Sequence, residues 1–434
     1  MMTEPYWWDS AGPPQPTERR ELPKEVDVLV VGAGLTGLSA SRTLAKGGKS
    51  VLCVDAGPPG IGASSRNGGM IGGGHRVTAD TMCARYGKQV AARLLRELHL
   101  DSTEFALSLM AEEKIDCDFS RTGRFVAQWA PAHYENSARD LDRLQSMVRI
   151  DAEMVPRNRQ HEELTTDLYH GGVLYGLHGG LNPAKWLAGL LRAAESAGAL
   201  VQSHSPVTDL HRTGSGFRAG IAGTSVRAGE VLIATNGYTA GQFGATGKRI
   251  FPVPSYIIVT EELGTNRVRS LFPKDRMIVE TREKHCYYRP SPDGKRIVFG
   301  GRAALFQAPP WFFRRQLTGL LTGIFPELKG VAITHSWKGN TGFTFEMSPH
   351  VGKIDGLWHA MGYCGNGNSM APYLGYKAAS RILGDSNGET AFAETPLPDR
   401  WWFRGQPWFL IFVDAAFRGR DAWSGMRGRL AKRS

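Results

Sequence analysis

A glycine-rich turn between two apolar strands lies near the beginning of the sequence. Residues 26–31 are apolar enough for a buried strand, which leads into the glycines of a G-x-G-x-x-G motif, Gly32, Gly34 and Gly37. An alanine- and leucine-rich stretch typical of a helix follows, and a second apolar strand then ends at Asp55. This order of strand, turn, helix, strand and acid is the dinucleotide-binding fingerprint in its required context.

Each part of this motif has a physical purpose. Gly32 permits the tight turn, Gly34 lets the backbone approach a pyrophosphate, and Gly37 lets the helix pack closely on the strand. The helix N-terminus offers N–H groups and a positive dipole end to phosphates. Asp55 can accept hydrogen bonds from ribose hydroxyls, while its charge disfavours the 2′-phosphate of NADP. A glycine turn without a cofactor is the alternative.

The composition is that of a folded globular protein. The chain has 434 residues, of which 41% are hydrophobic and 21% charged, enough for two or three domains or one large cofactor-binding assembly. Its five cysteines form no C-x-x-C pair, which argues against a zinc site or a disulfide framework and fits a reducing compartment. Residues 1–25 lack the apolar core of a signal peptide. We therefore expect a cytoplasmic protein without a metal site.

A second glycine-rich loop, residues 57–74, follows the acid and contains Gly-Ala-Ser-Ser-Arg-Asn-Gly-Gly at residues 62–69. With the aromatic segment at residues 6–9, it resembles the D-amino-acid oxidase family of flavoenzymes, and most closely the γ-glutamylputrescine oxidase-like branch. Glycine, sarcosine and iminodiacetate oxidases are relatives in that family. The resemblance extends to about residue 385 and implies FAD as the cofactor. For Arg66, the alternative is a solvated charge on a surface loop.

The resemblance also implies an α/β fold. A Rossmann-type FAD-binding domain would be interleaved with an α+β substrate domain that has a mostly antiparallel sheet, and alternating strand-like segments between residues 252 and 333 agree with such a sheet. The expected division is an N-terminal arm at 1–25, an FAD-binding domain at 26–90, 166–250 and 334–385, a substrate domain at 91–165 and 251–333, and a C-terminal tail at 386–434.

Three later segments resemble other cofactor-binding elements of the family. They are a strand near Val207 that would meet the adenine, a turn at residues 234–237 near the phosphates, and a glycine-rich turn from residue 362. That last turn would point a helix N-terminus at the flavin pyrimidine edge, where its dipole stabilises negative charge. The cofactor-binding residues implied by the resemblance are Gly32, Gly34, Leu35, Thr36, Gly37, Asp55, Ala56, Ser64, Ser65, Arg66, Asn67, Gly68, Gly69, Met70, Val207, Thr235, Asn236, Gly237, Gly365, Asn366, Gly367, Asn368, Ser369 and Met370.

Two residues depart from the family pattern. Asn366 stands where the family often has histidine, and an amide cannot act as a titrating base. Sarcosine oxidases can hold the flavin covalently through a cysteine, whereas the matching region here offers Thr341. We therefore expect non-covalent FAD, with Cys364 as a packing residue near the flavin.

The implied reaction is transfer of a hydride from the C–H beside an amine nitrogen to flavin N5. The protein mainly orients the substrate, keeps its nitrogen neutral and excludes water. The imine would hydrolyse to an aldehyde or oxoacid plus an amine, with oxygen reduced to hydrogen peroxide. Arginines hold carboxylates bidentately, which suggests a small anionic amine such as iminodiacetate or sarcosine, whereas the branch resemblance suggests γ-glutamylputrescine.

The candidate substrate-binding residues are Arg76, Arg289, Arg302 and Tyr287, and the candidate catalytic residues are Tyr256, Tyr288, His285 and Asn366. His75 is a further possible proton acceptor. Alternation along a strand places Tyr287 and Arg289 on one face and Tyr288 on the other, so only one of these faces can meet the flavin.

The tail is basic and aromatic. Residues 400–434 contain eight Lys or Arg and two Asp, a charge of +6 within the net +11 of the chain, interleaved with Trp and Phe. The tail could pack its aromatics on the body or contact the inner face of a membrane. Two alternative functions follow: a membrane-peripheral amine dehydrogenase that reduces quinone, and an RNA-modifying flavoenzyme. The excess positive charge is concentrated in the tail and does not form a stripe around the active-site mouth, so we expect no nucleic-acid partner.

Overall fold

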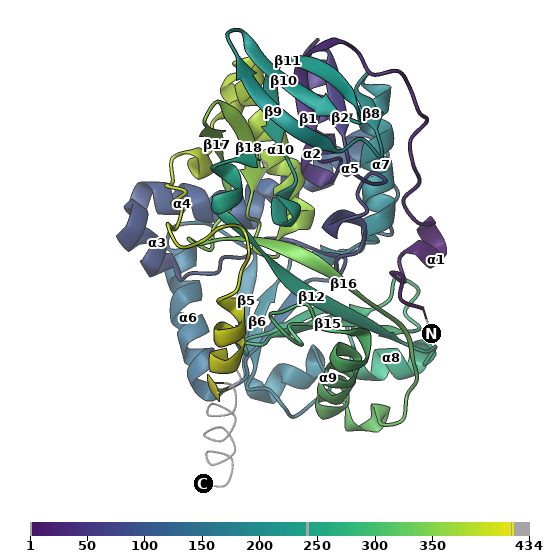
Figure 1. The fold of residues 1–434 in the computed structure, drawn as a ribbon. Coiled ribbons are helices and arrows are strands. Elements are labelled where there is room, and N and C mark those ends of the chain that lie inside the picture. Colours follow the sequence, from purple (N-terminus) through teal and green to yellow (C-terminus); the bar gives the residue numbers. More distant parts are fainter. Residues whose placement is uncertain (1, 240–242, 418, 421–434) are drawn as a thin grey trace.

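The computed structural model describes residues 2–239, 243–417 and 419–420. Two large β-sheets organise the chain, one in the upper half of Figure 1 and one in the lower half. Helices cover the outer sides of both sheets, and the chain passes between the sheets several times. The expected combination of a parallel nucleotide-binding sheet and a mostly antiparallel second sheet is confirmed.

Eight strands of the described chain form the first sheet, in the order β17-β18-β11-β1-β2-β8, with β10 paired to β11 and β9 paired to β10. The pairs around β1 are parallel, and β1 and β2 are apolar because both of their faces are covered. The strands are β1 (Glu25–Val31), β2 (Val51–Val54), β8 (Leu200–Gln202), β9 (Val207–Thr213), β10 (Gly216–Ile221), β11 (Thr224–Ile233), β17 (His350–Ile354) and β18 (Leu357–Met361).

Four helices pack together beside this sheet: α2 (Leu35–Lys46), α5 (Ser102–Glu112), α7 (Pro183–Ser196) and α10 (Gly367–Leu383). The Asn182 side chain accepts hydrogen bonds from the N–H groups of Ala184 and Lys185, and Pro183 takes the first helical position of α7. Helix α2 contacts both α7 and α10, so the first glycine turn and the last glycine-rich turn lead into neighbouring helices.

The second sheet, in the order β16-β12-β15-β14-β13-β4-β6-β5, also has eight strands within the described residues. Only the pair of β13 and β4 is parallel among its described pairings. Helices α8 (Thr265–Leu271) and α9 (Pro310–Ile324) contribute to a hydrophobic core against it. The strands are β4 (Arg124–Ala127), β5 (Ala152–Val155), β6 (Gly172–Tyr175), β12 (Ile250–Thr260), β13 (Met277–Glu280), β14 (Cys286–Pro290), β15 (Ile297–Gly301) and β16 (Ile333–Thr344).

The remaining elements join the two sheets. They are the helices α1 (Trp8–Ala11), α3 (Ala79–Tyr86), α4 (Lys88–Arg96) and α6 (Pro131–Gln145), and a small antiparallel pair of β3 (Met70–Ile71) and β7 (Gly179–Gly180). The glycine-rich residues 171–181 thus contain two short strands, β6 and β7. Strands β6 and β16 both belong to the second sheet, where β6 pairs with β4 and β5 and β16 pairs with β12. Both strands fall in segments expected to belong to the FAD-binding domain. Long-range pairing decides this division, and the local sequence does not reveal it.

The N-terminal arm packs on the second sheet. The Trp7 side chain is fully buried in a cluster with Ile257, Val259, Val298 and Trp337.

Among the described residues, no helix combines the length and apolar character needed to cross a membrane.

Candidate active site

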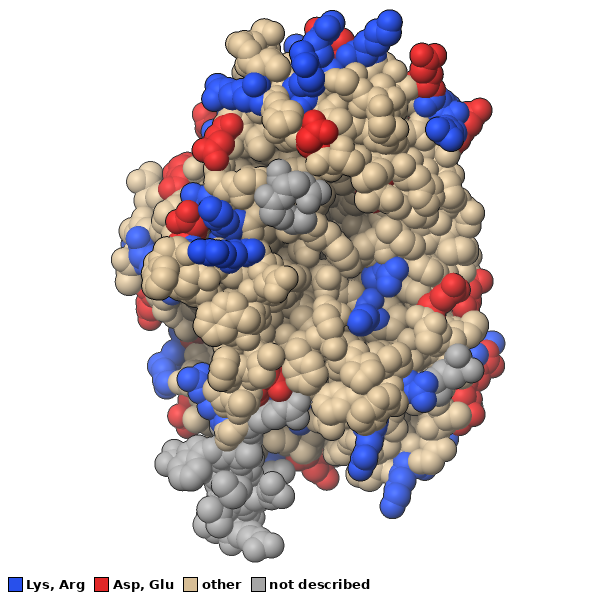
Figure 2. Space-filling view, in the orientation of Figure 1, with Lys and Arg blue, Asp and Glu red and all other residues tan. Residues whose placement is uncertain are grey.

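A cavity of about 1160 Å³ reaches from the glycine turn after β1 to the inner face of the second sheet. Most small-molecule sites are roughly 300–1,000 Å³, so this cavity has room for a dinucleotide together with a substrate. The face drawn in Figure 2 is hollowed near its centre, where the border is largely uncharged. The expected cofactor residues that line the cavity are Gly32, Gly34, Leu35, Thr36, Asp55, Ala56, Ser64, Arg66, Asn67, Gly68, Met70, Val207, Thr235, Asn236, Gly365, Asn366, Gly367 and Asn368.

The other expected cofactor residues do not line the cavity: Gly37, Ser65, Gly69, Gly237, Ser369 and Met370. Gly37 and Ser65 instead stabilise the segments that form the cavity wall. A Cβ on Gly37 would lie 1.9 Å from the carbonyl oxygen of Gly32, so only glycine lets α2 approach the turn. The Ser65 hydroxyl donates to the carbonyl of Gly60 at 2.9 Å.

The glycine turn has the geometry that a pyrophosphate needs. Gly32 has φ +105°, a conformation that favours glycine, and Gly34 precedes the first residue of α2 without a side-chain cap. The helix therefore presents its N-terminus to the cavity. At the end of β2, the carboxylate of Asp55 accepts hydrogen bonds from the N–H groups of Ala33 (2.9 Å) and Gly57 (3.0 Å). Burial raises the pKa of Asp55, and these hydrogen bonds oppose that rise.

Two buried tryptophans hold the second glycine loop. The indole N–H of Trp7 donates to the Asn67 carbonyl, and that of Trp337 donates to the Arg66 carbonyl, both at 2.7 Å. Arg66 is half-buried and donates to the Ile61 and Lys338 carbonyls, so it is not the solvated loop charge of the alternative reading. The loop is therefore fixed in place by residues from the arm and from β16.

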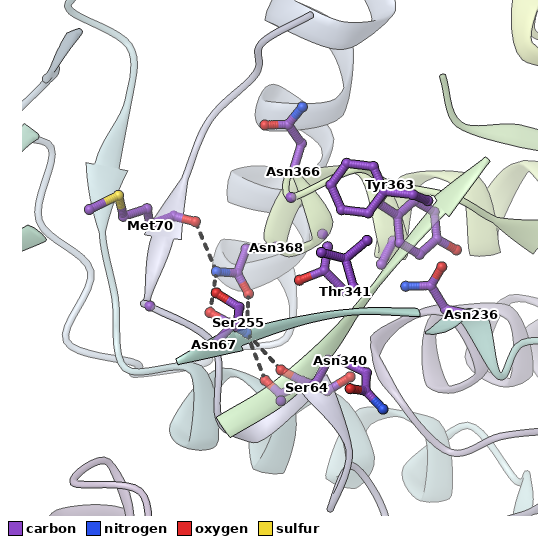
Figure 3. Close-up of a pocket in the computed structure, with 18 of the residues that line it drawn as sticks. Ser64, Asn67, Met70, Asn236, Ser255, Asn340, Thr341, Tyr363, Asn366 and Asn368 are labelled. Carbon is purple, nitrogen blue, oxygen red and sulfur yellow. Dashed lines mark hydrogen bonds between the residues drawn. The ribbon is translucent and has the colours of Figure 1, made fainter. Parts of the chain in front are cut away.

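An asparagine pair joins this loop to the last helix. The side-chain amides of Asn67 and Asn368 donate to each other's oxygens, at 3.1 and 2.8 Å, and Asn368 also donates to the Met70 carbonyl (Figure 3). The Asn366 amide donates to the Gly74 carbonyl at 2.6 Å and precedes α10 without capping it. The α10 N-terminus thus opens into the cavity with its positive dipole end, as predicted.

Arginines collect at the end of the cavity beside the second sheet. Arg76 and Arg302 both line it, as does Arg124, which sequence reasoning missed. Burial, together with the positive charge of Arg76, lowers the pKa of Arg302 to about 9 and that of Arg124 to about 10. Among the described residues, the carboxylates of this wall pair with other groups: Asp140 with His75, Glu280 with Arg282, and Glu283 with Arg420. This end of the cavity is therefore cationic.

His285 and Tyr287 complete this wall. Burial lowers the pKa of His285 well below its usual value, and Arg302 and Arg76 lower it further, so its imidazole is neutral at pH 7. The Tyr287 hydroxyl lies 2.8 Å from the Ser255 hydroxyl, and burial raises the pKa of Tyr287 to about 12. Both side chains are therefore uncharged hydrogen-bonding groups.

Three other candidates lie away from the cavity. Tyr288 faces the core behind the sheet, and its hydroxyl is hydrogen-bonded to the Tyr169 hydroxyl. The Tyr256 hydroxyl accepts a hydrogen bond from the Ala308 N–H. Arg289 shares the Tyr287 face of β14, but its guanidinium donates to the Gly69 and Leu181 carbonyls. Strand alternation correctly made Tyr287 and Tyr288 mutually exclusive, and the structure places Tyr287 at the cavity. Tyr256, Tyr288 and Arg289 therefore bind other parts of the protein and do not line the cavity.

Two features of the site escaped sequence reasoning. Arg124 begins β4 and reaches the cavity because β4 pairs with β13, far along the chain. His99 lines the cavity from the helical segment before α5, 2.8 Å from His75, whose other nitrogen lies 2.7 Å from Asp140. Neither residue belongs to a local motif. An arginine opening an alternating strand was the only available signal for Arg124.

The C-terminal segment closes one side of the cavity. Phe409, Leu410, Val413 and Phe417 line it, so part of the tail packs its aromatics on the body. Other side chains of the segment face outward, and Trp401 is 92% exposed. The basic residues from 427 onward lie outside the described residues. Cys364 is buried and burial raises its pKa to about 11, in keeping with a packing thiol.

Known proteins are similar to this chain over most of its length. The chain is 30% identical over 399 residues to γ-glutamylputrescine oxidoreductase of Escherichia coli (strain K12), covering 91% of this chain and 92% of that protein. Glycine oxidase of Bacillus licheniformis is 24% identical over 382 residues, or 83% of this chain and 94% of that protein. The relatives match the chain over most of their length, and so the comparison concerns whole enzymes.

Solved structures share the fold. Glycine oxidase from Geobacillus kaustophilus superposes with a TM-score of 0.71 at 20% identity, covering 87% of this chain and 99% of that one. Iminodiacetate oxidase from Chelativorans sp. BNC1 gives 0.65 at 19% identity, covering 85% and 97%. Residues 27–381 match the family model described as FAD dependent oxidoreductase, DAO. The chain therefore belongs to this family of FAD-dependent oxidoreductases, whose members related to it act on amines and amino acids.

Proposed function

We propose that this enzyme oxidises the C–N bond of a small amine that carries a carboxylate. The observation behind the proposal is the pair of Arg76 and Arg302 in the cavity, without a carboxylate partner within ion-pair distance among the described residues. Two guanidinium groups that face an enclosed space favour an anionic ligand. A substrate carboxylate would restore the charge balance that the protein leaves incomplete.

The cavity fits FAD at its other end. The α2 N-terminus and Asp55 suit the pyrophosphate and ribose, Val207 lines the adenine side, and the α10 N-terminus suits the flavin. Bound FAD supplies a hydride acceptor. We propose non-covalent binding because Thr341 lines the cavity where a cysteine would be needed.

The protein residues would act on the substrate in three ways. Arg76 and Arg302 hold its carboxylate, which orients the neighbouring C–H bond. The same positive charges lower the pKa of a bound ammonium group and so favour the neutral, reactive amine. Tyr287, fixed by Ser255, and the neutral His285 provide hydrogen-bonding groups without adding charge. Phe409 and Phe417 help to exclude water from the chamber.

The test is anaerobic mixing of the purified holoenzyme with sarcosine, iminodiacetate, glycine, D-alanine, proline and γ-glutamylputrescine. Bleaching of the flavin absorption by a carboxylate-bearing amine supports the proposal. Reoxidation by air with stoichiometric hydrogen peroxide supports oxygen as acceptor, and reoxidation only by a quinone analogue supports the dehydrogenase alternative. Putrescine, an amine without a carboxylate, is added as a control, and bleaching of the flavin by putrescine alone would overturn the role of the arginines. Neither the quinone-linked nor the RNA-modifying alternative gains support from the comparisons.

We also propose that the enzyme is cytoplasmic, and that the exposed aromatic side chains of Trp401, Trp408 and Phe412 could contact a membrane. Flotation with anionic vesicles, before and after changing these three residues to serine, tests that contact. Because their side chains point outward, the changes leave the cavity wall intact.

A further inference from the structure

Arg124, Arg76 and Arg302 each donate to one backbone carbonyl and leave other N–H groups free of described partners. Arg124 donates to the Gly73 carbonyl at 2.8 Å, Arg76 to that of Cys364 at 2.8 Å, and Arg302 to that of Glu283 at 3.5 Å. Glu283 attracts Arg302 from beyond ion-pair distance. Three cations in one cavity exceed what a single carboxylate needs.

Strand register places Arg124 and Arg302 at opposite ends of the cavity floor. Strands β4, β13 and β15 run in the same direction, with β14 antiparallel between the last two. Val126, Val279 and Tyr287 form one cross-sheet row with Gly300, so Arg124 lies two residues before that row and Arg302 two residues after it.

Arg124 and Arg302 are three strand spacings apart across the sheet and four residues apart along it. With about 4.8 Å between strands and about 3.3 Å per residue, their Cα atoms are roughly 20 Å apart. The charge of Arg76 acts on both residues, so Arg76 lies near each of them. Arg124 and Arg302 therefore enter the cavity from opposite ends of its floor. Arg76 can share in either end.

The surroundings of Arg124 form a polar pocket with unused hydrogen-bonding atoms. Its Nε is buried without a hydrogen-bond partner among the described residues, and so are the Nδ1 atoms of His99 and His178. Nε2 of His178 accepts the Gly73 N–H at 3.1 Å, which leaves its Nδ1 protonated as a donor. The Tyr175 ring stacks on both imidazoles and lines the cavity. Arg124, His99 and Tyr175 line the cavity, whereas His178 lies behind the Tyr175 ring, so the guanidinium of Arg124 is the group on this side that suits an anion.

We propose that Arg124, with Arg76, forms a second anion subsite, and that the natural substrate is an amine carrying two carboxylates, one at Arg302 and one at Arg124. This inference rests on the proposed function and narrows its substrate class. The amine carbon to be oxidised would lie between the two anchored groups, held from both sides. A substrate with one carboxylate would leave Arg124 and its neighbours without a partner.

The first test measures binding to the holoenzyme without turnover. Succinate and propionate are titrated against the visible absorption of the bound flavin in the wild type, Arg124→Gln, Arg124→Lys and Arg121→Gln. We expect succinate to bind more tightly than propionate, and Arg124→Gln to reduce that preference by roughly 10- to 100-fold, as for loss of a hydrogen bond to a charged group. Arg124→Lys should keep part of the preference. Arg121 is exposed three residues earlier, so its variant is the matched control.

The second test uses iminodiacetate and sarcosine, secondary amines that differ by one carboxylate. Iminodiacetate should bleach the wild-type flavin at lower concentration, and Arg124→Gln should remove most of that advantage. Equal binding of succinate and propionate by the wild type, or an unchanged preference in Arg124→Gln, would overturn the second subsite. If sarcosine still bleaches the flavin in that case, the proposed function stands alone. If no carboxylate binds and no amine bleaches the flavin, both proposals fail.

Discussion

Replacing Gly37 with alanine tests how closely α2 must approach the glycine turn. The added Cβ would lie 1.9 Å from the Gly32 carbonyl oxygen, 1.1 Å short of a 3.0 Å contact, and 3.2 Å from a methyl of Val30. Backbone on both sides must therefore move. Overpacking of this kind costs ~1–3 kcal/mol, whereas removing a helical glycine gains ~0.5–1 kcal/mol. Because the contact is with backbone, the cost lies at the upper end of its range and we expect a net loss of ~2 kcal/mol.

Gly319 provides the matched control. It lies in the exposed part of α9, and a Cβ there would meet no atom within 4 Å among the described residues. Gly319→Ala should therefore raise the urea midpoint, with the helix-propensity gain alone. Gly37→Ala should lower it, and should also lower the FAD content after dialysis because the displaced turn faces the cavity. If the two variants shift the midpoint equally and retain equal FAD, the close approach does not constrain this turn.

Three further outcomes are expected. Arg302→Lys should raise the KM for an anionic amine by roughly tenfold or more, because a point charge replaces a bidentate fork; an unchanged KM in steady-state assays would contradict the proposed contact. Trp7→Phe should weaken FAD binding by ~1 kcal/mol, the usual value of one hydrogen bond, since it frees the Asn67 carbonyl; equilibrium dialysis measures this. Burial lowers the pKa of His350 to about 4 and of His359 to about 3. The unfolded chain therefore binds more protons below pH 6.5, and stability falls as the pH drops from 7 to 5, by ~2 kcal/mol per independent histidine. His359→Leu should flatten that slope in urea titrations, and an equal slope would show that the pair does not govern it.

Local sequence patterns predicted the cofactor end of the site well. The G-x-G-x-x-G turn, Asp55 and the α10 N-terminus depend on contiguous residues whose geometry follows from glycine conformations and helix ends. The substrate end depends on pairing between distant strands. Arg289 and Arg302 both lie near the end of a strand. Arg289 donates its hydrogen bonds to the backbone carbonyls of Gly69 and Leu181, whereas Arg302 lines the cavity.

Non-local register explains these differences. Arg124 enters the site only because β4 pairs with β13, some 150 residues later in the chain. The segment joining the two strands gives no sign of that pairing. Alternation could state that Tyr287 and Tyr288 exclude each other, but which face meets the cavity depends on α8 and α9 covering the opposite one.

The contact between α2 and α10 has a consequence for how this enzyme could diverge. A Cβ on Gly375 would lie 2.3 Å from the Thr36 carbonyl oxygen, the Ser39 hydroxyl donates to the Pro372 carbonyl, and the Thr36 and Tyr363 hydroxyls lie 2.6 Å apart. The helices that face the two ends of the dinucleotide are thus clamped into one frame. Substrate preference can change by exchanging side chains on β4, β14 and β15, and the position of the redox centre would be inherited unaltered by each new specificity.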